Sequence, residues 1–250
     1  MKRLLIALAG LTLSASALAS GGHPLPFAFT PDTANLPSVQ RGARDYMAYC
    51  SGCHSMKHMR YSRIAQDLGI PEDMVKKNLM FTTDKIGDHI ISSMPVAQAQ
   101  QWFGQAPPDL TVETRARGAD WVYSYLNSFY IDESRPVGVN NLVLPGASMP
   151  HVLWELQGWQ VKSEAKAEGE HAEAGHGEEH HGTGLELAQP GKLSPEEYKK
   201  FTADLTNFMV YAAEPGRAQR IALGPKVILY LLVLTFLFYA LKKEFWKDIH

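Results

Sequence analysis

Apolar residues recur every three or four positions over residues 38–50, which is the spacing of one face of an α-helix. Ser38 is placed to cap the first turn of this helix. Gly42 lies within it, and a position without a side chain lets a second helix approach closely. The face that we expect to be buried in the core consists of Val39, Ala43, Tyr46 and Cys50.

A second helix is predicted over residues 195–212 by a start signal as well as by periodicity. Ser194 is the cap, Pro195 takes the first helical position and Glu197 completes a capping box. The pattern stops or bends at Glu214-Pro215-Gly216. The apolar stripe of this helix consists of Tyr198, Phe201, Leu205, Phe208 and Ala212.

Between these two helices the apolar pattern is shorter and more often broken. Short helical patterns alternate with turns over residues 55–110, and one helix is expected to start at Gly69-Ile70-Pro71-Glu72-Asp73. Residues 111–130 look helical. Residues 131–150 contain three prolines and two glycines, so we expect loops there.

Both ends of the chain carry longer apolar runs. Residues 1–19 are typical of a secretory signal peptide, because Lys2 and Arg3 precede an apolar run that ends in small residues suited to cleavage. Residues 221–241 are apolar except for Lys226, which can extend its amine to the interface. A helix of that length spans about 30 Å, which is enough to cross a bilayer. We therefore expect residues 20–220 to form a periplasmic domain and residues 242–250 a cytoplasmic tail.

The 250 residues carry a formal net charge of −2, so no basic excess points to nucleic acid. One segment departs from the average composition. Residues 163–184 are mainly Glu, Ala, Gly and His, and they cannot bury enough surface to offset the entropy lost on ordering. We expect a flexible acidic insertion there. Its histidines could bind a metal, but they show no fixed ligand spacing.

The residues that carry chemistry are concentrated at Cys50-Ser51-Gly52-Cys53-His54, which matches the attachment sequence for c-type haem. Two thiols three residues apart on a helical turn reach the two vinyl groups of one haem, and the adjacent imidazole is presented to the iron. Attachment would use both cysteines of the chain, which explains the absence of any other.

Other uses of a Cys-x-x-Cys pair fit less well. A thioredoxin-like redox pair expects an early βαβ pattern, and none is visible. A zinc site needs a second ligand pair of similar spacing. A simple disulfide, usual in an exported protein with two cysteines, leaves His54 unexplained.

The residues alone leave the second axial ligand open. Methionine commonly accompanies histidine at electron-transfer haems and raises the reduction potential. Met56 and Met59 lie too close to His54 to reach the opposite haem face easily. Met94 and Met149 both precede a proline in an irregular stretch, which suits a ligand loop. The downstream candidates are Met56, Met59, Met80, Met94, Met149 and Met209.

Several motifs follow one another along almost the whole mature chain: Gln40-Arg41-Gly42, the segment 50–57, Arg60-Tyr61, the segment 106–110 with Arg115-Ala116-Arg117, the segment 144–150, and the segment 212–215 before the apolar span. In kind and in order these motifs resemble the cytochrome c1 family, the haem subunits of cytochrome bc1 complexes. The insertion at 163–184 is the main departure from that family.

The resemblance implies roles for single residues. His54 and Met149 would be the axial ligands of the haem iron. Arg117, with Arg115 as the second choice, would pair with a haem propionate, because a guanidinium offsets carboxylate charge. The residues that would line the haem pocket are Pro107 and Pro108.

The resemblance also implies a mainly α fold: a class I cytochrome c-like domain with long loop insertions and one C-terminal transmembrane helix. The helix at 38–50 would cross the helix at 195–212. The implied function is electron transfer from a Rieske iron–sulfur protein to a c-type cytochrome, in a respiratory bc1 complex that also contains cytochrome b and is dimeric. The implied location is the bacterial inner membrane, single-pass, with the haem domain facing the periplasm.

Two other functions stay open as alternatives. A c-haem peroxidase or a catalytic oxidase subunit needs an open sixth position on the iron and often has a second Cys-x-x-Cys-His. A metal-handling anchor built around the histidine-rich segment leaves residues 50–54 unexplained. An absorption spectrum separates the three, because they predict a low-spin His/Met haem, a ligand-binding high-spin haem, or no haem.

Overall fold

The computed structural model of the chain describes residues 25–163 and 184–247. The predicted signal peptide at 1–19, nearly all of the predicted insertion at 163–184 and the last three residues lie outside this range. The elements are, in chain order, α2 (Leu36–Tyr49), β1 (Met56–Arg60), α3 (Tyr61–Leu68), α4 (Glu72–Asn78), β2 (His89–Ile90), α5 (Val96–Phe103), α6 (Glu113–Arg117), α7 (Ala119–Asn127), β3 (Phe129–Ile131), β4 (Val139–Asn141), α8 (Trp154–Gln157), β5 (Gly158–Lys162), β6 (Leu185–Pro190), α9 (Pro195–Ala213) and α10 (Arg217–Phe245).

The mainly α fold expected from the sequence is confirmed, and the strands form three short antiparallel pairs within the described residues. β1 pairs with β2, β3 with β4, and β5 with β6. These strands are too short for their alternation to be distinguished from loop sequence, so the apolar pattern does not predict them. The pair β5–β6 brackets the acidic segment, with Lys162 opposite Leu185.

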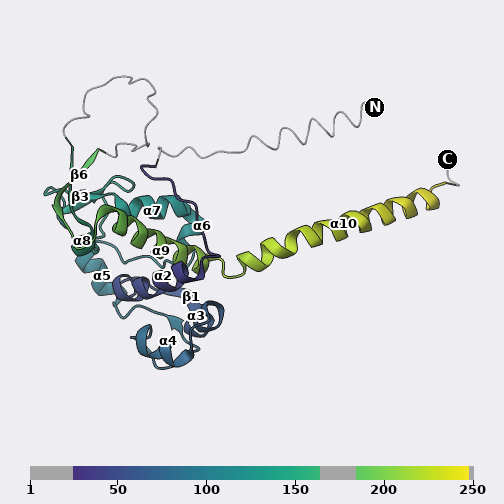
Figure 1. Cartoon of the computed structure of the whole chain (residues 1–250), viewed down its shortest axis with the longest axis horizontal. Helices are drawn as coiled ribbons and strands as arrows, with labels where there is room; N and C mark the ends of the chain where they lie inside the picture. Colours follow the sequence, from purple (N-terminus) through teal and green to yellow (C-terminus); the bar gives the residue numbers. More distant parts are fainter. Residues whose placement is uncertain (1–24, 164–183, 248–250) are drawn as a thin grey trace, which may run out of the picture.

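Helices α2 and α9 pack against each other at the centre of the domain (Figure 1). The prediction that Gly42 permits a close helix approach is confirmed: a Cβ atom there would lie 2.0 Å from the carbonyl oxygen of Asp204 on α9. Polar side chains also join the two helices. Asp204 accepts a hydrogen bond from Ser38 (2.6 Å) and two from the guanidinium of Arg41 (2.6 and 2.9 Å).

The start of α2 differs from the prediction. The helix begins at Leu36, and its cap is Asn35, whose side chain accepts a hydrogen bond from the Ser38 backbone N–H. Ser38 is therefore not the cap; it is buried, and its hydroxyl bonds Asp204 across the helix contact. By contrast, the predicted capping box at Ser194 and Glu197 is confirmed at the start of α9.

The helical character expected over residues 111–130 is found over most of the segment, but as two helices, because Gly118 divides it into α6 and α7 with φ of +101°. A left-handed glycine cannot continue an α-helix. After α7 the chain turns into β3. The helix expected to start near Glu72 is confirmed as α4.

The C-terminal helix α10 projects away from the rest of the protein (Figure 1). It starts just after Glu214-Pro215-Gly216, where α9 ends. No residue of α10 is buried, although it is strongly apolar, and it is long enough to cross a membrane. A helix of 29 residues that is apolar and yet unburied is not a core helix of the domain. α10 is therefore a candidate membrane span.

Candidate haem-attachment site

The two cysteines lie on the turn that follows α2. The backbone N–H of Cys50 donates to the carbonyl of Tyr46 (2.9 Å), which continues the helical pattern by one residue. The next turn is closed by Cys53 and His54, whose N–H groups both donate to the carbonyl of Cys50 (3.1 and 2.8 Å). The turn therefore brings two thiols and one imidazole together within five consecutive residues.

The imidazole of His54 is held by a segment far away in the sequence. Its Nδ1 lies 2.8 Å from the carbonyl oxygen of Pro108. A carbonyl can only accept a hydrogen bond, so Nδ1 carries the proton and the lone pair of the neutral ring is on Nε2. Burial lowers the pKa of His54, which favours the neutral form that coordinates iron.

A second anchor fixes the backbone of His54. The hydroxyl of Tyr46, a fully buried residue, donates a hydrogen bond to the His54 carbonyl (2.8 Å). Tyr46 was identified from the sequence as a core residue of α2. Its hydrogen bond was not, since periodicity places a ring on a face but does not predict the partner of its hydroxyl.

Asp109 joins the two segments that meet at His54. Its carboxylate accepts hydrogen bonds from the backbone N–H of Lys57 (2.7 Å) and from the backbone and hydroxyl of Thr111 (3.0 and 2.5 Å). The backbone N–H of Leu110 donates to the carbonyl of Ser55 (2.9 Å). These bonds hold the Pro108 carbonyl opposite the imidazole. Sequence reasoning missed Asp109, although an Asp two residues before a Thr is a recognisable turn signal.

The thiols have the character of attachment points rather than of redox nucleophiles. Burial raises the pKa of Cys50 to about 12 and also raises that of Cys53. Catalytic dithiols have lowered pKa values, because the thiolate is the nucleophile. The alternative of a thioredoxin-like pair is therefore disfavoured by the surroundings as well as by the sequence. Two thiols and one imidazole on the same turn fit haem c, in which the sulfurs form thioethers with the porphyrin and the imidazole binds the iron.

The candidate sixth ligands differ in their surroundings. Met56, Met59, Met80 and Met209 are buried in the hydrophobic core, where their sulfurs are enclosed by protein. Met94 and Met149 are both partly exposed. Of these two, Met149 packs against the core. Burial thus leaves Met94 and Met149, the two methionines that precede a proline in an irregular stretch. They differ in packing, since only Met149 contacts the core.

The loop before Met149 is held by hydrogen bonds to side chains of β4 and of Arg135, which precedes β4. Asn141 accepts hydrogen bonds from the backbone of Val143 (2.9 Å) and Leu144 (3.3 Å). The side chain of Asn140 accepts one from Gly146 (2.8 Å), and Arg135 donates one to the Gly146 carbonyl (2.8 Å). Such a loop holds its methionine in a fixed position.

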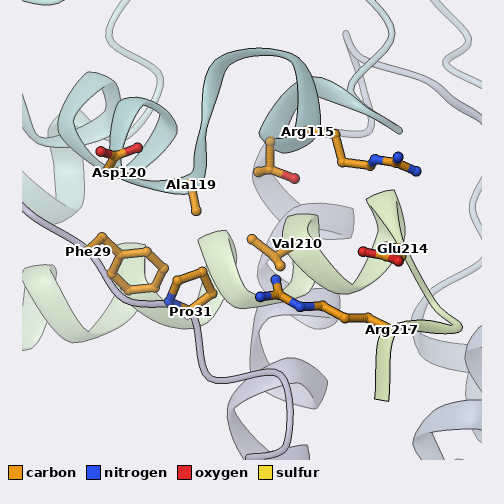
Figure 2. Close-up of a pocket in the computed structure, with 9 residues that line it drawn as sticks. Phe29, Pro31, Arg115, Ala119, Asp120, Val210, Glu214 and Arg217 are labelled. Atoms are coloured by element: carbon orange, nitrogen blue, oxygen red, sulfur yellow. The ribbon is translucent and has the colours of Figure 1, made fainter. Parts of the chain in front are cut away.

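The two arginines proposed for a propionate lie on different sides of α6. Arg117 pairs with Glu113 (2.5 Å) and lies over the ring of Trp121, 4.4 Å from its centroid. Arg115 instead lines a pocket beside Glu214 (Figure 2). Pro107 is half-buried, while the Pro108 ring is exposed and its carbonyl contacts His54. These placements do not bring all four predicted residues to one point.

A cavity of about 680 Å³ adjoins the attachment turn. Ser51 and Gly52, the middle residues of the motif, lie on its wall. Phe81 and Ile91 also line it, and they are 65% and 45% exposed. The turn therefore borders an open hollow, lined by both apolar and polar residues, rather than a sealed interior.

Comparison with known proteins gives a consistent family assignment. The model of the cytochrome C1 family matches residues 26–157 and 192–249. Cytochrome c1 of Allochromatium vinosum is 46% identical over the full length of both chains. The ammonia monooxygenase gamma subunit of Nitrosomonas europaea is 44% identical over 88% of this chain and 86% of that protein. Cytochrome b/c1 of Bradyrhizobium diazoefficiens is 25% identical over 85% of this chain and 33% of that protein.

The unmatched residues 158–191 contain the acidic segment, in agreement with its description as the departure from the family pattern. The matched blocks contain the attachment turn, the Pro108–Asp109 segment, the Met149 loop and α10. The chain belongs to the cytochrome c1 family.

Proposed function

We propose that this protein is the haem c electron-transfer subunit of a cytochrome bc1 complex. It would accept single electrons from a Rieske iron–sulfur protein and pass them to a c-type cytochrome. The observation that carries the proposal is the geometry of His54. Its Nδ1 is engaged by the Pro108 carbonyl, so Nε2 is left as the ligand nitrogen within the Cys-x-x-Cys-His turn.

When bound, haem c supplies an iron that changes its charge by one electron. In this proposal Cys50 and Cys53 would hold the porphyrin covalently, and His54 and Met149 would bind its iron. The hydrogen bond from His54 to Pro108 fixes the ring orientation and increases its basicity as a ligand. Arg117, with Arg115 as the second choice, is assigned to a propionate, and Pro107 and Pro108 to the pocket wall.

Membrane attachment supports placing the chain in such a complex. α10 is the candidate span, and in this proposal it anchors the domain in the bacterial inner membrane with the haem side facing the periplasm. The name of the Bradyrhizobium relative joins cytochrome b with c1, which supports cytochrome b as a partner. A dimeric complex is part of the same proposal.

The name of the Nitrosomonas relative gives a second candidate, a subunit of an ammonia monooxygenase. Purification of the native complex separates the two. Co-purification with cytochrome b and a Rieske subunit supports the first proposal, whereas co-purification with monooxygenase subunits supports the second.

Covalent attachment is tested by replacing the thiols. Cys50→Ser and Cys53→Ser should each weaken haem attachment, and the double variant should abolish it, because no other cysteine is present in the chain. The measurement is haem staining after denaturing electrophoresis, with immunodetection of the polypeptide as the loading control. A normally stained band from the double variant would contradict the haem proposal.

A further inference from the structure

A second pocket, separate from the attachment turn, lies where the soluble domain meets α10. Its volume is about 280 Å³. Arg115 and Glu214 lie at one end and Asp120 with Phe29 at the other, and the Arg217 side chain extends toward Val210 and Pro31 (Figure 2). The full lining is Phe29, Pro31, Thr114, Arg115, Ala119, Asp120, Val210, Glu214 and Arg217.

The pocket is lined by two arginines, Arg115 and Arg217, and two carboxylates, and one of these carboxylates, Asp120, lies at the end away from Arg115 (Figure 2). Glu214 is already paired, since Arg220 donates to both of its oxygens (2.6 and 3.1 Å). The pKa of Glu214 is lowered, first by the hydrogen bond from Arg220 and further by the charges of Arg115 and Arg217. Among the described residues, the side chains of Arg115 and Arg217 have no ion pair or hydrogen bond, so their donors are free.

Helix geometry places the side chains of Arg115 and Arg117 on different faces of α6. Residues two apart on a helix do not share a face. Arg117 lies over Trp121, whereas Arg115 lines the pocket beside Glu214. Arg115 is therefore available for a ligand that differs from the one assigned to Arg117.

The position of the pocket along α10 points to a class of ligand. Arg217 is the first residue of α10, and the apolar stretch begins at Ile221, about 6 Å further along the helix axis. The stretch from Ile221 to Leu241 matches the roughly 30 Å thickness of the hydrocarbon core. The headgroup layer extends about 5–8 Å beyond that core on each side. Arg217 thus lies at the level of the lipid phosphates.

We propose that this pocket binds the phosphate of a phospholipid from the leaflet on the side of the haem domain, with Arg115 at one end and Arg217 across the pocket supplying the positive charge (Figure 2). Guanidinium groups bind phosphate oxygens through paired, charge-assisted hydrogen bonds. The first turn of α10 adds to the attraction, because it has neither an acidic residue nor a side-chain cap. The inference rests on the proposed membrane anchoring by α10 but not on haem binding.

The test uses the full-length holoprotein in nanodiscs of phosphatidylethanolamine and phosphatidylglycerol. Native mass spectrometry after mild detergent extraction counts the phospholipids that are retained. The variants are Arg115→Gln, Arg217→Gln and the double variant. The matched control is Lys192→Gln, which also removes an exposed cation but one paired with Glu155, outside the pocket. Circular dichroism checks that each variant is folded.

The wild type and the Lys192→Gln control should retain one phospholipid that the double variant loses. Titration with dioctanoyl phosphatidylglycerol should show the dissociation constant rising about tenfold for each arginine removed. Dioctanoylglycerol, which has no phosphate, should bind the wild type at least tenfold more weakly than dioctanoyl phosphatidylglycerol.

Equal retention by the wild type and the double variant would overturn the inference, as would equal affinity for the two dioctanoyl lipids. Complete displacement of the lipid by an equal concentration of inorganic phosphate would show a free-anion site instead. Failure of the chain to enter nanodiscs would contradict the anchoring proposal as well. Entry without a retained lipid would contradict only this inference.

Discussion

Met149 and Met94 both precede a proline in irregular segments, but the protein holds them differently. Met149 packs against the core at the end of a loop fixed by Asn140, Asn141 and Arg135. Met94 is outside the core cluster, and its N–H donates to the Ser92 hydroxyl (3.1 Å). A ligand bond to iron requires a fixed sulfur position, so the packing favours Met149.

We therefore expect Met149→Lys to keep covalent haem but to lower the reduction potential by on the order of a few hundred millivolts, because the thioether favours reduced iron. Redox titration, with absorption and electron paramagnetic resonance spectra of the axial field, provides the measurement. Met94→Lys is the matched control and should leave the potential near that of the wild type. The reverse outcome, with the change at Met94 only, would assign the ligand to the other loop.

The attachment motif and its histidine could be read from five consecutive residues, since their chemistry depends on local spacing. The partners of His54 could not. The Pro108 carbonyl and the Asp109 carboxylate lie more than fifty residues away, and only the fold brings them to the imidazole. Periodicity and spacing describe single segments, so a contact between distant segments is recognised only by resemblance or from the structure.

At the scale of elements, the contact between α2 and α9 depends on one missing side chain. Alanine in place of Gly42 would put its Cβ 2.0 Å from the Asp204 carbonyl oxygen and 2.8 Å from the Phe208 Cβ. Glycine to alanine in a helix ordinarily stabilises it by about 0.5–1 kcal/mol. Here we expect the opposite sign, a loss of about 1–3 kcal/mol, because the helices must separate.

Denaturant unfolding of the full-length protein, followed by the haem absorbance, measures this loss for Gly42→Ala. Gly87→Ala serves as the control, because nothing lies within 4 Å of the added Cβ and Gly87 does not have a left-handed φ. The control should change the free energy of unfolding by less than about 0.5 kcal/mol. Unchanged or increased stability in Gly42→Ala would show that α2 and α9 are not closely packed.

The same elements show why boundaries are harder to predict than helices. Both α2 and α9 were recognised by their apolar stripes, and α9 by its complete capping box. The start of α2 was misplaced because Asn35 and Ser38 are both good caps, and the buried bond of Ser38 to Asp204 comes from another helix. Gly118 divides α6 from α7 through its backbone φ, which an apolar pattern does not report.

At the scale of the whole molecule, the acidic segment is attached at a single place on the fold. It leaves the end of β5 and returns to the start of β6, and the N–H of Ser163 donates to the Gly184 carbonyl (2.8 Å) across its base. Gly184 has a φ of +66°, which suits the left-handed position of a short hairpin loop. Removal of residues 164–182 leaves three residues to connect Lys162 with Leu185.

We expect this deletion to leave haem attachment and membrane assembly intact, because the hairpin can close with a three-residue loop. It removes six glutamates and one lysine, so the salt dependence of the reaction with a basic cytochrome c should become shallower. Stopped-flow kinetics at several ionic strengths provide the measurement, and a variant with the six glutamates changed to glutamine is the charge control. Loss of haem in the deletion would show that the segment is structural.

The last whole-molecule feature is the separation of the domain from α10. The core lies entirely before Glu214, and no residue of α10 is buried. The attachment turn, both capped helices and the Met149 loop precede it as well. A chain ending after Arg220 keeps the Arg220–Glu214 ion pair, so the junction is also preserved. The domain should therefore fold without the span.

Truncation after Arg220 should release a soluble haem-bearing domain to the periplasm, because export depends on the predicted signal peptide at residues 1–19 and not on α10. Its association with the quinol-oxidising subunits should weaken by orders of magnitude, since the span keeps the domain at high effective concentration beside them. Fractionation and haem staining provide the measurement, with the full-length chain as the membrane-bound reference. Haem staining that stays in the washed membrane pellet, in cells without the partner subunits, would mean that the chain is held by a different segment, with an uncleaved signal peptide as the first to examine.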